Sequence, residues 1–212
     1  MAEIKTSNGI FEFNEVEFKN GIKKINLDIS KKNLLDLKKI LDKNDIYFGL
    51  IYGTLLGAIR EKNFIAHDED TDIFMLEEDK DKLLNILNIF VDNGFLVGRY
   101  TEKLLSVIRN GEYIDIYFFK KKGVLRRECE GYIIDSIFLE NTEDYSFLGD
   151  SFRIPVRAKE LLVKLYGSDW ETPKENEPAS NYTCYLSIKM FIMKRSLFLY
   201  KIIGSIKRKL NV

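Results

Sequence analysis

Residues 52–73 read YGTLLGAIREKNFIAHDEDTDI and decide how the rest of the chain is interpreted. A short β-prone apolar run precedes them at residues 46–51, and residues 55–61 have helical spacing, so Gly53 falls at a strand-to-helix turn. A second strand is predicted at residues 71–76, where the acidic run gives way to apolar residues. The segment therefore predicts a glycine turn and a group of carboxylates close to two strands.

The acidic run, HDEDTD at residues 67–72, is the densest group of ionisable side chains in the sequence. Alternate residues of a strand point to the same face, so Asp70 and Asp72 are expected to share a face about 6.5 Å apart at their Cα atoms. Carboxylates this close repel each other unless a cation lies between them, and hard oxygen ligands favour Mg²⁺ or Mn²⁺. Asp115 lies between two isoleucines in another predicted strand, and it supplies a third carboxylate if the two strands are neighbours.

Each of these features also has an interpretation without a metal. The acidic run can be a solvated turn or a helix cap, and Asp115 can be an outward-facing acid on a half-exposed strand. His67 is expected at the surface or behind the ligands rather than among them. The metal site therefore depends on the three aspartates coming together.

The turn before the acidic run can bind an anion. Gly53 and Thr54 stand at a helix N-terminus, where unpaired backbone N–H groups and the helix dipole favour a phosphate. Arg60 falls about two turns along the same helix and can reach a phosphate or a carboxylate. An ordinary strand-to-helix turn is the alternative interpretation.

The other predicted elements alternate between helices and strands. Asp28 or Ser30 is expected to cap a helix that ends near Asp45, and a second helix closes at Gly94. Asn110-Gly111 predicts a hairpin turn. The predicted helices span residues 77–93 and 157–166, and the predicted strands span residues 9–18, 95–100, 104–109, 113–119, 124–139 and 151–155.

Composition favours one folded core. The chain has 212 residues, 45% of them hydrophobic, and its two cysteines form no disulfide or zinc pattern. No signal peptide and no run of about 18 apolar residues is present, which favours a cytoplasmic protein. The formal net charge is zero, so nucleic-acid binding is not expected. The charge is unevenly distributed, because the chain after Ser180 has seven basic residues and no acidic one. Residues 186–210 interleave these cations with apolar residues, which predicts peripheral contact with an anionic membrane or a helix packed on the body or on a second subunit.

The segment at residues 52–73 resembles the signature of the LicD family, which includes the fukutin-related proteins and belongs to the nucleotidyltransferase-fold superfamily. Two further blocks, residues 113–118 and residues 154–170, are similar to family features in order and spacing. The sequence departs from the family at Ala66-His67, where the family has Pro-Trp, and at Glu69, where it has aspartate. The matching positions in the first block are Gly53, Thr54, Leu55, Leu56, Gly57, Arg60, Phe64, Ile65, Asp68, Asp70 and Asp72.

The resemblance implies an α+β fold with a nucleotidyltransferase-like mixed sheet flanked by helices. This catalytic domain would span residues 1–175, and a linker with a basic amphipathic C-terminal helix would span residues 176–212. By position, the resemblance implies metal ligands at Asp70 and Asp72 and a third carboxylate, ligand or general base, at Asp115.

For the donor, the resemblance implies that the Gly53-Thr54 turn contacts a phosphate. Cationic side chains should also assist the departure of the leaving group, and the candidates are Arg60, Arg109 and Lys103.

The implied activity is that of a Mg²⁺- or Mn²⁺-dependent phosphotransferase. Such an enzyme takes a phospho-alcohol, for example phosphocholine or a polyol phosphate, from a CDP-linked donor. It places this group on a hydroxyl of a cell-surface glycan such as capsule, lipopolysaccharide or teichoic acid, which can be lipid-linked at the inner face of the membrane. Two alternatives stay open: an NTP-dependent nucleotidyltransferase acting on a sugar phosphate or antibiotic, and a non-catalytic subunit that docks a partner enzyme at the membrane.

Overall fold

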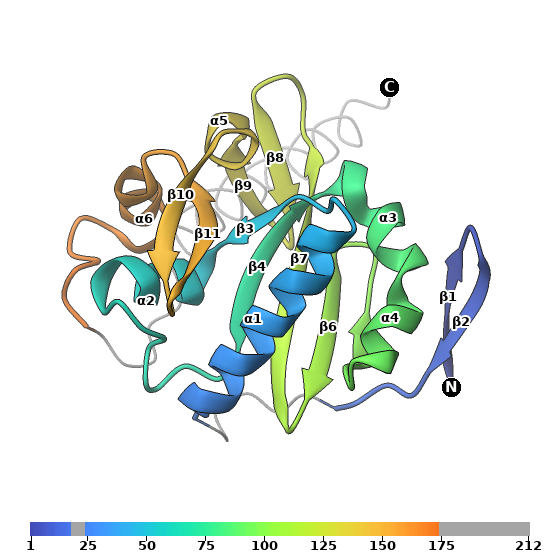
Figure 1. The fold of residues 1–212 in the computed structure, drawn as a ribbon. Coiled ribbons are helices and arrows are strands. Elements are labelled where there is room, and N and C mark those ends of the chain that lie inside the picture. Colours follow the sequence, from blue (N-terminus) through green and yellow to red (C-terminus); the bar gives the residue numbers. More distant parts are fainter. Residues whose placement is uncertain (18–23, 174–212) are drawn as a thin grey trace, which may run out of the picture. The chain divides into compact units, whose positions relative to one another are not determined.

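A seven-stranded mixed sheet holds the segment that decides the fold (Figure 1). Among its described strands, β4 and β7 run parallel, and the remaining hydrogen-bonded pairs are antiparallel. The strand order is β3 (Phe48–Leu50), β4 (Thr71–Leu76), β7 (Glu112–Lys121), β6 (Leu104–Arg109) and β5 (Leu96–Tyr100), and β8 (Arg126–Cys129) and β9 (Tyr132–Asp135) extend from β7. This confirms the expected α+β class with a mixed sheet.

The structure is a computed structural model that describes residues 1–17 and 24–173. The chain divides into two compact units, Met1–Leu161 and Leu162–Val212, and the whole sheet belongs to the first. The predicted linker and C-terminal helix at residues 176–212, with the membrane-contacting segment 186–210, lie outside the described residues. Within the described ranges, no helix is both long and apolar enough to cross a membrane.

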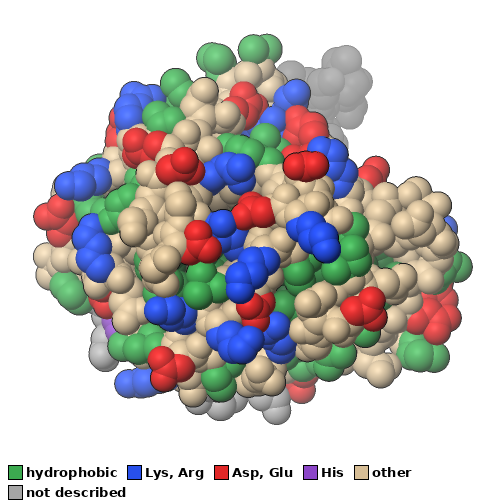
Figure 2. Space-filling model, viewed as in Figure 1, with side chains coloured by type: hydrophobic (Ala, Val, Ile, Leu, Met, Phe, Trp, Pro, Cys, Tyr) green, Lys and Arg blue, Asp and Glu red, His purple; other side chains and the backbone are tan. Residues whose placement is uncertain are grey.

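Helix α1 (Leu27–Lys43) covers one face of the sheet and lies in front of it in Figure 1. Its cap differs from the expectation, because the side chain of Asn26 accepts from the N–H of Ile29 at 3.1 Å and the helix begins before Asp28 and Ser30. Its outer surface alternates lysine and aspartate in i,i+4 pairs, and both charges are interspersed on this side of the molecule in Figure 2.

Helix α2 (Tyr52–Arg60) follows β3 directly, with extended Ile51 between them. This confirms the predicted strand-to-helix turn. The backbone N–H of Ile51 donates to the carbonyl of Asp72 at 3.4 Å, so the turn is joined to the start of β4.

The predicted helix at residues 77–93 is broken into three pieces: a 3₁₀ turn, Glu77–Asp79, then α3 (Lys80–Asn85) and α4 (Leu87–Asp92). Helices α3 and α4 are separated at Ile86. The residue before it, Asn85, accepts hydrogen bonds from Ser7 and Asn8 in the turn between β1 and β2. Asn85 Oδ1 accepts from the Ser7 backbone N–H at 2.9 Å, and the Asn85 carbonyl accepts from Asn8 Nδ2 at 3.2 Å. Gly94 ends α4 with φ +79°, as predicted.

Several smaller elements complete the described part of the chain. The turn between β6 and β7 has positive φ at both Asn110 and Gly111, which confirms the predicted hairpin. Residues 136–140 form a helix rather than part of a strand, and a strand before residue 150 was not foreseen. These elements are β1 (Ala2–Thr6) paired with β2 (Gly9–Phe13), α5 (Ser136–Glu140), β10 (Thr142–Phe147) paired with β11 (Asp150–Pro155), and α6 (Ala158–Tyr166).

Candidate active site

The Gly53 turn packs directly on two acidic side chains. The backbone N–H of Gly53 donates to Asp72 Oδ2 at 3.0 Å, and Thr54 Oγ1 accepts from the backbone N–H of Asp72 at 2.8 Å. A Cβ at position 53 would overlap Asp68 Oδ2 and lie 3.2 Å from Asp72 Oδ2. A side chain at this position would therefore have to displace Asp68, and the turn that was expected to contact a phosphate holds a carboxylate in place.

Strand pairing brings Asp72 and Asp115 side by side. They occupy the same register position of the parallel strands β4 and β7, so their side chains point to the same face of the sheet with the strands about 4.8 Å apart. Both are buried, and Asp70, two residues before Asp72, is half-buried. The structure thus places Asp72 beside Asp115, and Asp70 close enough for its charge and theirs to influence one another.

The carboxylates raise one another's pKa. The pKa of Asp70 is raised to about 8, first by burial and then by the negative charges of Asp115, Asp68 and Glu69. Burial, Asp70 and Asp68 raise the pKa of Asp72 well above its ordinary value, and burial also raises the pKa of Asp68. Full ionisation of these carboxyl groups is therefore unfavourable in their surroundings, and an added cation would favour it.

Asp115 is held by two residues that the sequence analysis missed. Arg99 Nη2 donates to Asp115 Oδ2 at 2.9 Å, the hydroxyl of Ser106 donates to Asp115 Oδ1, and Arg99 Nε donates to Ser106 Oγ at 3.0 Å. Burial still raises the pKa of Asp115, although Ser106 and Arg99 act in the opposite direction. Ser106 lies opposite Asp115 on β6, and Arg99 lies opposite Ser106 on β5, so only the register of three strands reveals this group.

The donor set suits a hard divalent cation, although the ligands are not preassembled. Within residues 1–17 and 24–173, no three His, Cys, Asp or Glu side chains are grouped closely enough to hold a metal ion. Asp70 and Asp72 nevertheless provide carboxylate oxygens with raised pKa values, which is the chemistry that Mg²⁺ and Mn²⁺ neutralise. The chemistry of these oxygen donors, rather than their present spacing, is what suits such an ion.

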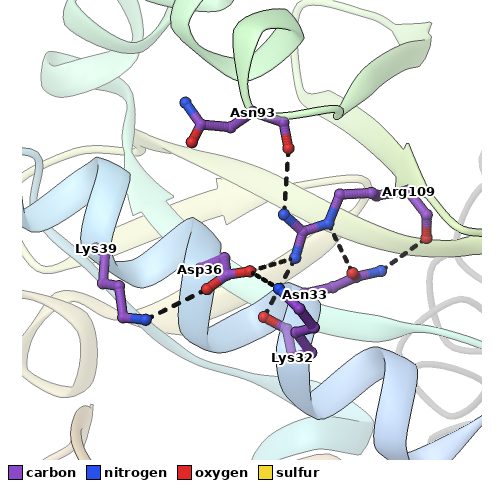
Figure 3. Close-up of polar contacts among 6 residues, drawn as sticks. All are labelled: Lys32, Asn33, Asp36, Lys39, Asn93 and Arg109. Carbon is purple, nitrogen blue, oxygen red and sulfur yellow. Dashed lines mark hydrogen bonds and ion pairs between the residues drawn. The ribbon is translucent and has the colours of Figure 1, made fainter.

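Arg109 of β6 contacts residues of α1 and the residue that follows α4 (Figure 3). Its Nε donates to Asn33 Oδ1 at 2.8 Å, its Nη2 donates to Asp36 Oδ2 at 2.8 Å, and its Nη1 donates to the Asn93 carbonyl at 3.2 Å. Since side chains alternate along β6, Arg109 points to the face opposite Ser106, toward α1. The structure therefore gives Arg109 a role in packing α1 on the sheet.

The structure also gives positions to the other basic candidates. Arg60, in the last turn of α2, pairs with Glu61 at 2.7 Å. The carbonyl of Lys103 accepts from the backbone N–H of Phe118, which lies about 10 Å along β7 from Asp115. His67 is half-buried and favours the charged form of its neighbour Asp68.

Tyrosine side chains border the carboxylates, and the sequence analysis did not single them out. Tyr113 and Tyr117 share the face of Asp115, because the three alternate along β7, and both are half-buried. Burial first, and then the nearby aspartates, raise the pKa of both phenols. The ring of Tyr52 packs edge-on against that of Tyr117, with 5.0 Å between the ring centroids. It also packs at a tilt against the ring of Tyr132 of β9, again with 5.0 Å between centroids. The alternation of residues 113, 115 and 117 was the available signal.

Known proteins resemble the part of the chain that builds this site. A family model described as LicD/FKTN/FKRP, nucleotidyltransferase domain, matches residues 45–156, which is slightly more than half of the chain. The matched range contains the Gly53 turn, the four aspartates and the residues that hold Asp115.

Two curated relatives are both described as uncharacterized proteins. RP689 of Rickettsia prowazekii (strain Madrid E) is 28% identical over 133 residues, which cover 62% of this chain and 47% of that protein. RT0683 of Rickettsia typhi (strain ATCC VR-144 / Wilmington) is 34% identical over 87 residues, which cover 41% of this chain and 27% of that protein. The chain therefore matches about half or less of the length of these relatives.

Solved structures of antibiotic-modifying proteins are similar at low identity. The lincomycin-bound lincosamide antibiotic adenylyltransferase LnuA is 12% identical with a TM-score of 0.46, over 62% of this chain and 83% of that chain. The antibiotic-resistance factor ANT(2'')-Ia in solution is 12% identical with a TM-score of 0.49, over 87% of this chain and 99% of that chain. The crystal structure of ANT(2'')-Ia with adenylyl-2"-tobramycin is 13% identical with a TM-score of 0.49, over 82% of this chain and 98% of that chain.

Proposed function

The chain belongs to the LicD family, and from this premise we propose that it is a phosphotransferase that moves a phospho-alcohol from a CDP-linked donor to a hydroxyl of a glycan. The observation that carries the proposal is the pairing of Asp72 with Asp115 in parallel strands, with the Gly53 turn packed against the carboxylates. Phosphoryl transfer requires this kind of preorganised charge next to the reacting phosphate.

We propose that Asp70 and Asp72 hold a Mg²⁺ or Mn²⁺ ion. When bound, such an ion neutralises phosphate charge in the reaction. Asp115 acts as the third ligand or as the general base, and its orientation is fixed by Arg99 and Ser106. The Gly53 turn keeps Asp72 pointing at the site through a backbone hydrogen bond.

In the proposed reaction, the acceptor oxygen forms a bond to the phosphorus that bears the alcohol. The bond from that phosphorus to the bridging oxygen breaks, CMP leaves with the bridging oxygen, and the acceptor proton passes to a carboxylate. Arg99 is a basic side chain that hydrogen-bonds a carboxylate of this group, so we propose it, in place of Arg109, as the cation beside the phosphates.

The proposal is tested by ³¹P NMR of the protein incubated with Mg²⁺, a lipid-free glycan acceptor and either CDP-choline or a CDP-linked polyol. The expected result is release of CMP and a new phosphodiester signal. Asp72→Asn should abolish both, whereas Asp92→Asn, which changes an exposed carboxylate of α4, should leave them unchanged. Release of pyrophosphate from CTP or ATP would instead favour a nucleotidyltransferase, and unchanged activity in Asp72→Asn would refute the site.

A further inference from the structure

The tip of the hairpin that joins β7 to β8 presents two apolar side chains to solvent. Val124 is 94% exposed and Leu125 is 76% exposed. Hydrophobic side chains project at the top of the view in Figure 2, over the β7–β8 hairpin and α5 of Figure 1. Val124 and Leu125 are adjacent, and contiguous exposed apolar side chains can mark an interaction surface.

The backbone holds this tip outward. Gly123 turns the chain with φ +70°, and the backbone N–H of Lys122 donates to the carbonyl of Arg126 at 2.8 Å to close the hairpin. The backbone N–H of Ser136, the first residue of α5, donates to the carbonyl of Leu125 at 2.8 Å. The next residue of α5, Ile137, is also exposed, so the apolar surface continues beside the hairpin.

Cations flank the apolar tip. Residues 120–127 read KKKGVLRR, and no acidic residue lies between Asp115 and Glu128. The acidic partners of these cations lie outside the stretch 120–127. Lys121 pairs with Glu78 at 3.2 Å, Lys122 with Glu128 at 2.7 Å, and Arg126 with Asp135 at 3.9 Å. The side chains of Lys121, Lys122 and Arg126 are exposed, and ion pairs of exposed side chains are weak in water, so these cations can exchange their partners for lipid phosphates. Arg127, by contrast, is buried and paired with Glu78 and Glu140.

We propose that this hairpin tip docks on an anionic lipid bilayer. Val124 and Leu125 enter the interface between headgroups and acyl chains, and Lys120, Lys121, Lys122 and Arg126 contact the anionic headgroups. An apolar tip with basic flanks is the chemistry that such an interface binds, since apolar burial and charge attraction act together. The surface is separate from the carboxylates, which lie near the other end of β7.

The proposal is tested with the full chain by co-sedimentation with vesicles of phosphatidylcholine containing phosphatidylserine, and with vesicles of phosphatidylcholine alone. The wild-type protein should bind the anionic vesicles more tightly, and added salt should weaken that binding. Replacing both Val124 and Leu125 with serine should weaken partitioning at least about tenfold, since two apolar side chains leave the interface. Lys122→Gln with Arg126→Gln should weaken binding to anionic vesicles only.

Leu96→Ser is the matched control, because Leu96 is 61% exposed on β5, away from the hairpin, and it should bind as the wild type does. Thermal unfolding of each variant verifies that it is folded. Wild-type binding by the Val124/Leu125 double variant, as expected if residues 186–210 alone bind the membrane, would overturn the proposal. Equal binding to neutral vesicles, or a tip that mediates self-association without binding lipid, would overturn it as well.

Discussion

Alanine substitutions at the two glycines of α2 are expected to have different effects: Gly57→Ala should lower stability, and Gly53→Ala should lower activity. Neither Gly53 nor Gly57 has a positive φ, so alanine fits the backbone and is favoured over glycine in a helix by about 1 kcal/mol. At Gly57 the added Cβ would lie 2.6 Å from the backbone oxygen of Asn63 and 3.1 Å from the backbone nitrogen of Ile65. Backbone atoms cannot rotate away, so the overlap costs about 3 kcal/mol, at the upper end for overpacking. The net loss is about 2 kcal/mol, which lowers the Tm of a chain of this length by about 4–8 °C.

At Gly53 the added Cβ meets the end of a side chain instead. Asp68 can rotate away at a cost of about 0.5–1.5 kcal/mol, which the helix preference of alanine roughly offsets. The Tm of Gly53→Ala should therefore stay close to that of the wild type. Displacing Asp68 disturbs the carboxylates, so CMP release should fall at least about tenfold, equivalent to about 1.4 kcal/mol of the barrier.

Circular dichroism melts and CMP-release assays of both variants measure these two effects. The reasoning is refuted if Gly57→Ala melts at the wild-type temperature, or if Gly53→Ala melts below Gly57→Ala. Full CMP-release activity in Gly53→Ala would show that the position of Asp68 does not matter for the reaction.

Three further predictions concern the ion pairs. Arg109→Gln should lower the free energy of unfolding by about 3 kcal/mol in urea denaturation, because it removes the guanidinium that joins α1 to β6 and α4, whereas Lys39→Gln at an exposed lysine beside Asp36 should change it by less than about 0.5 kcal/mol. Burial would raise the pKa of Asp36, but hydrogen bonds from Lys32 and Arg109 lower it from 3.8 to about 2. Its contribution to stability is therefore present above pH 3.8 and lost as the pH falls through about 2, so urea midpoints should drop over this window, less steeply in Asp36→Asn; an equal drop in both proteins would contradict this assignment. Arg99→Gln should destabilise the protein by about 1–3 kcal/mol at neutral pH, because buried Asp115 loses its charged partner, and Arg126→Gln, which lies 3.9 Å from Asp135 at the surface, should have little effect.

Features that depend on neighbouring residues could be predicted from the sequence. Asn110-Gly111 predicted a hairpin because both residues tolerate positive φ, and both adopt it. Gly53 predicted a strand-to-helix turn, and the apolar residues around Asp115 predicted a strand, with the burial of that acid left open. Both predictions required only local patterns of residue size and polarity.

Features that depend on distant pairings could not be predicted. Arg99 and Arg109 are both arginines on predicted strands, and only the register of β5, β6 and β7 shows that Arg99 reaches Asp115 while Arg109 points toward α1. The break at Ile86 has the same origin, because residues 7 and 8 occupy the polar groups of Asn85 from a distant hairpin. The helical spacing of apolar residues at 77–93 does not indicate that contact.

The central claim is that Asp70, Asp72 and Asp115 act together on a divalent cation, and calorimetric titration of the full chain with Mn²⁺ tests it most directly. The account predicts one saturable binding event in the wild-type protein, lost in Asp72→Asn and retained in the surface variant Asp92→Asn. Equal Mn²⁺ binding by the wild-type protein and Asp72→Asn, with both proteins folded, would contradict the account.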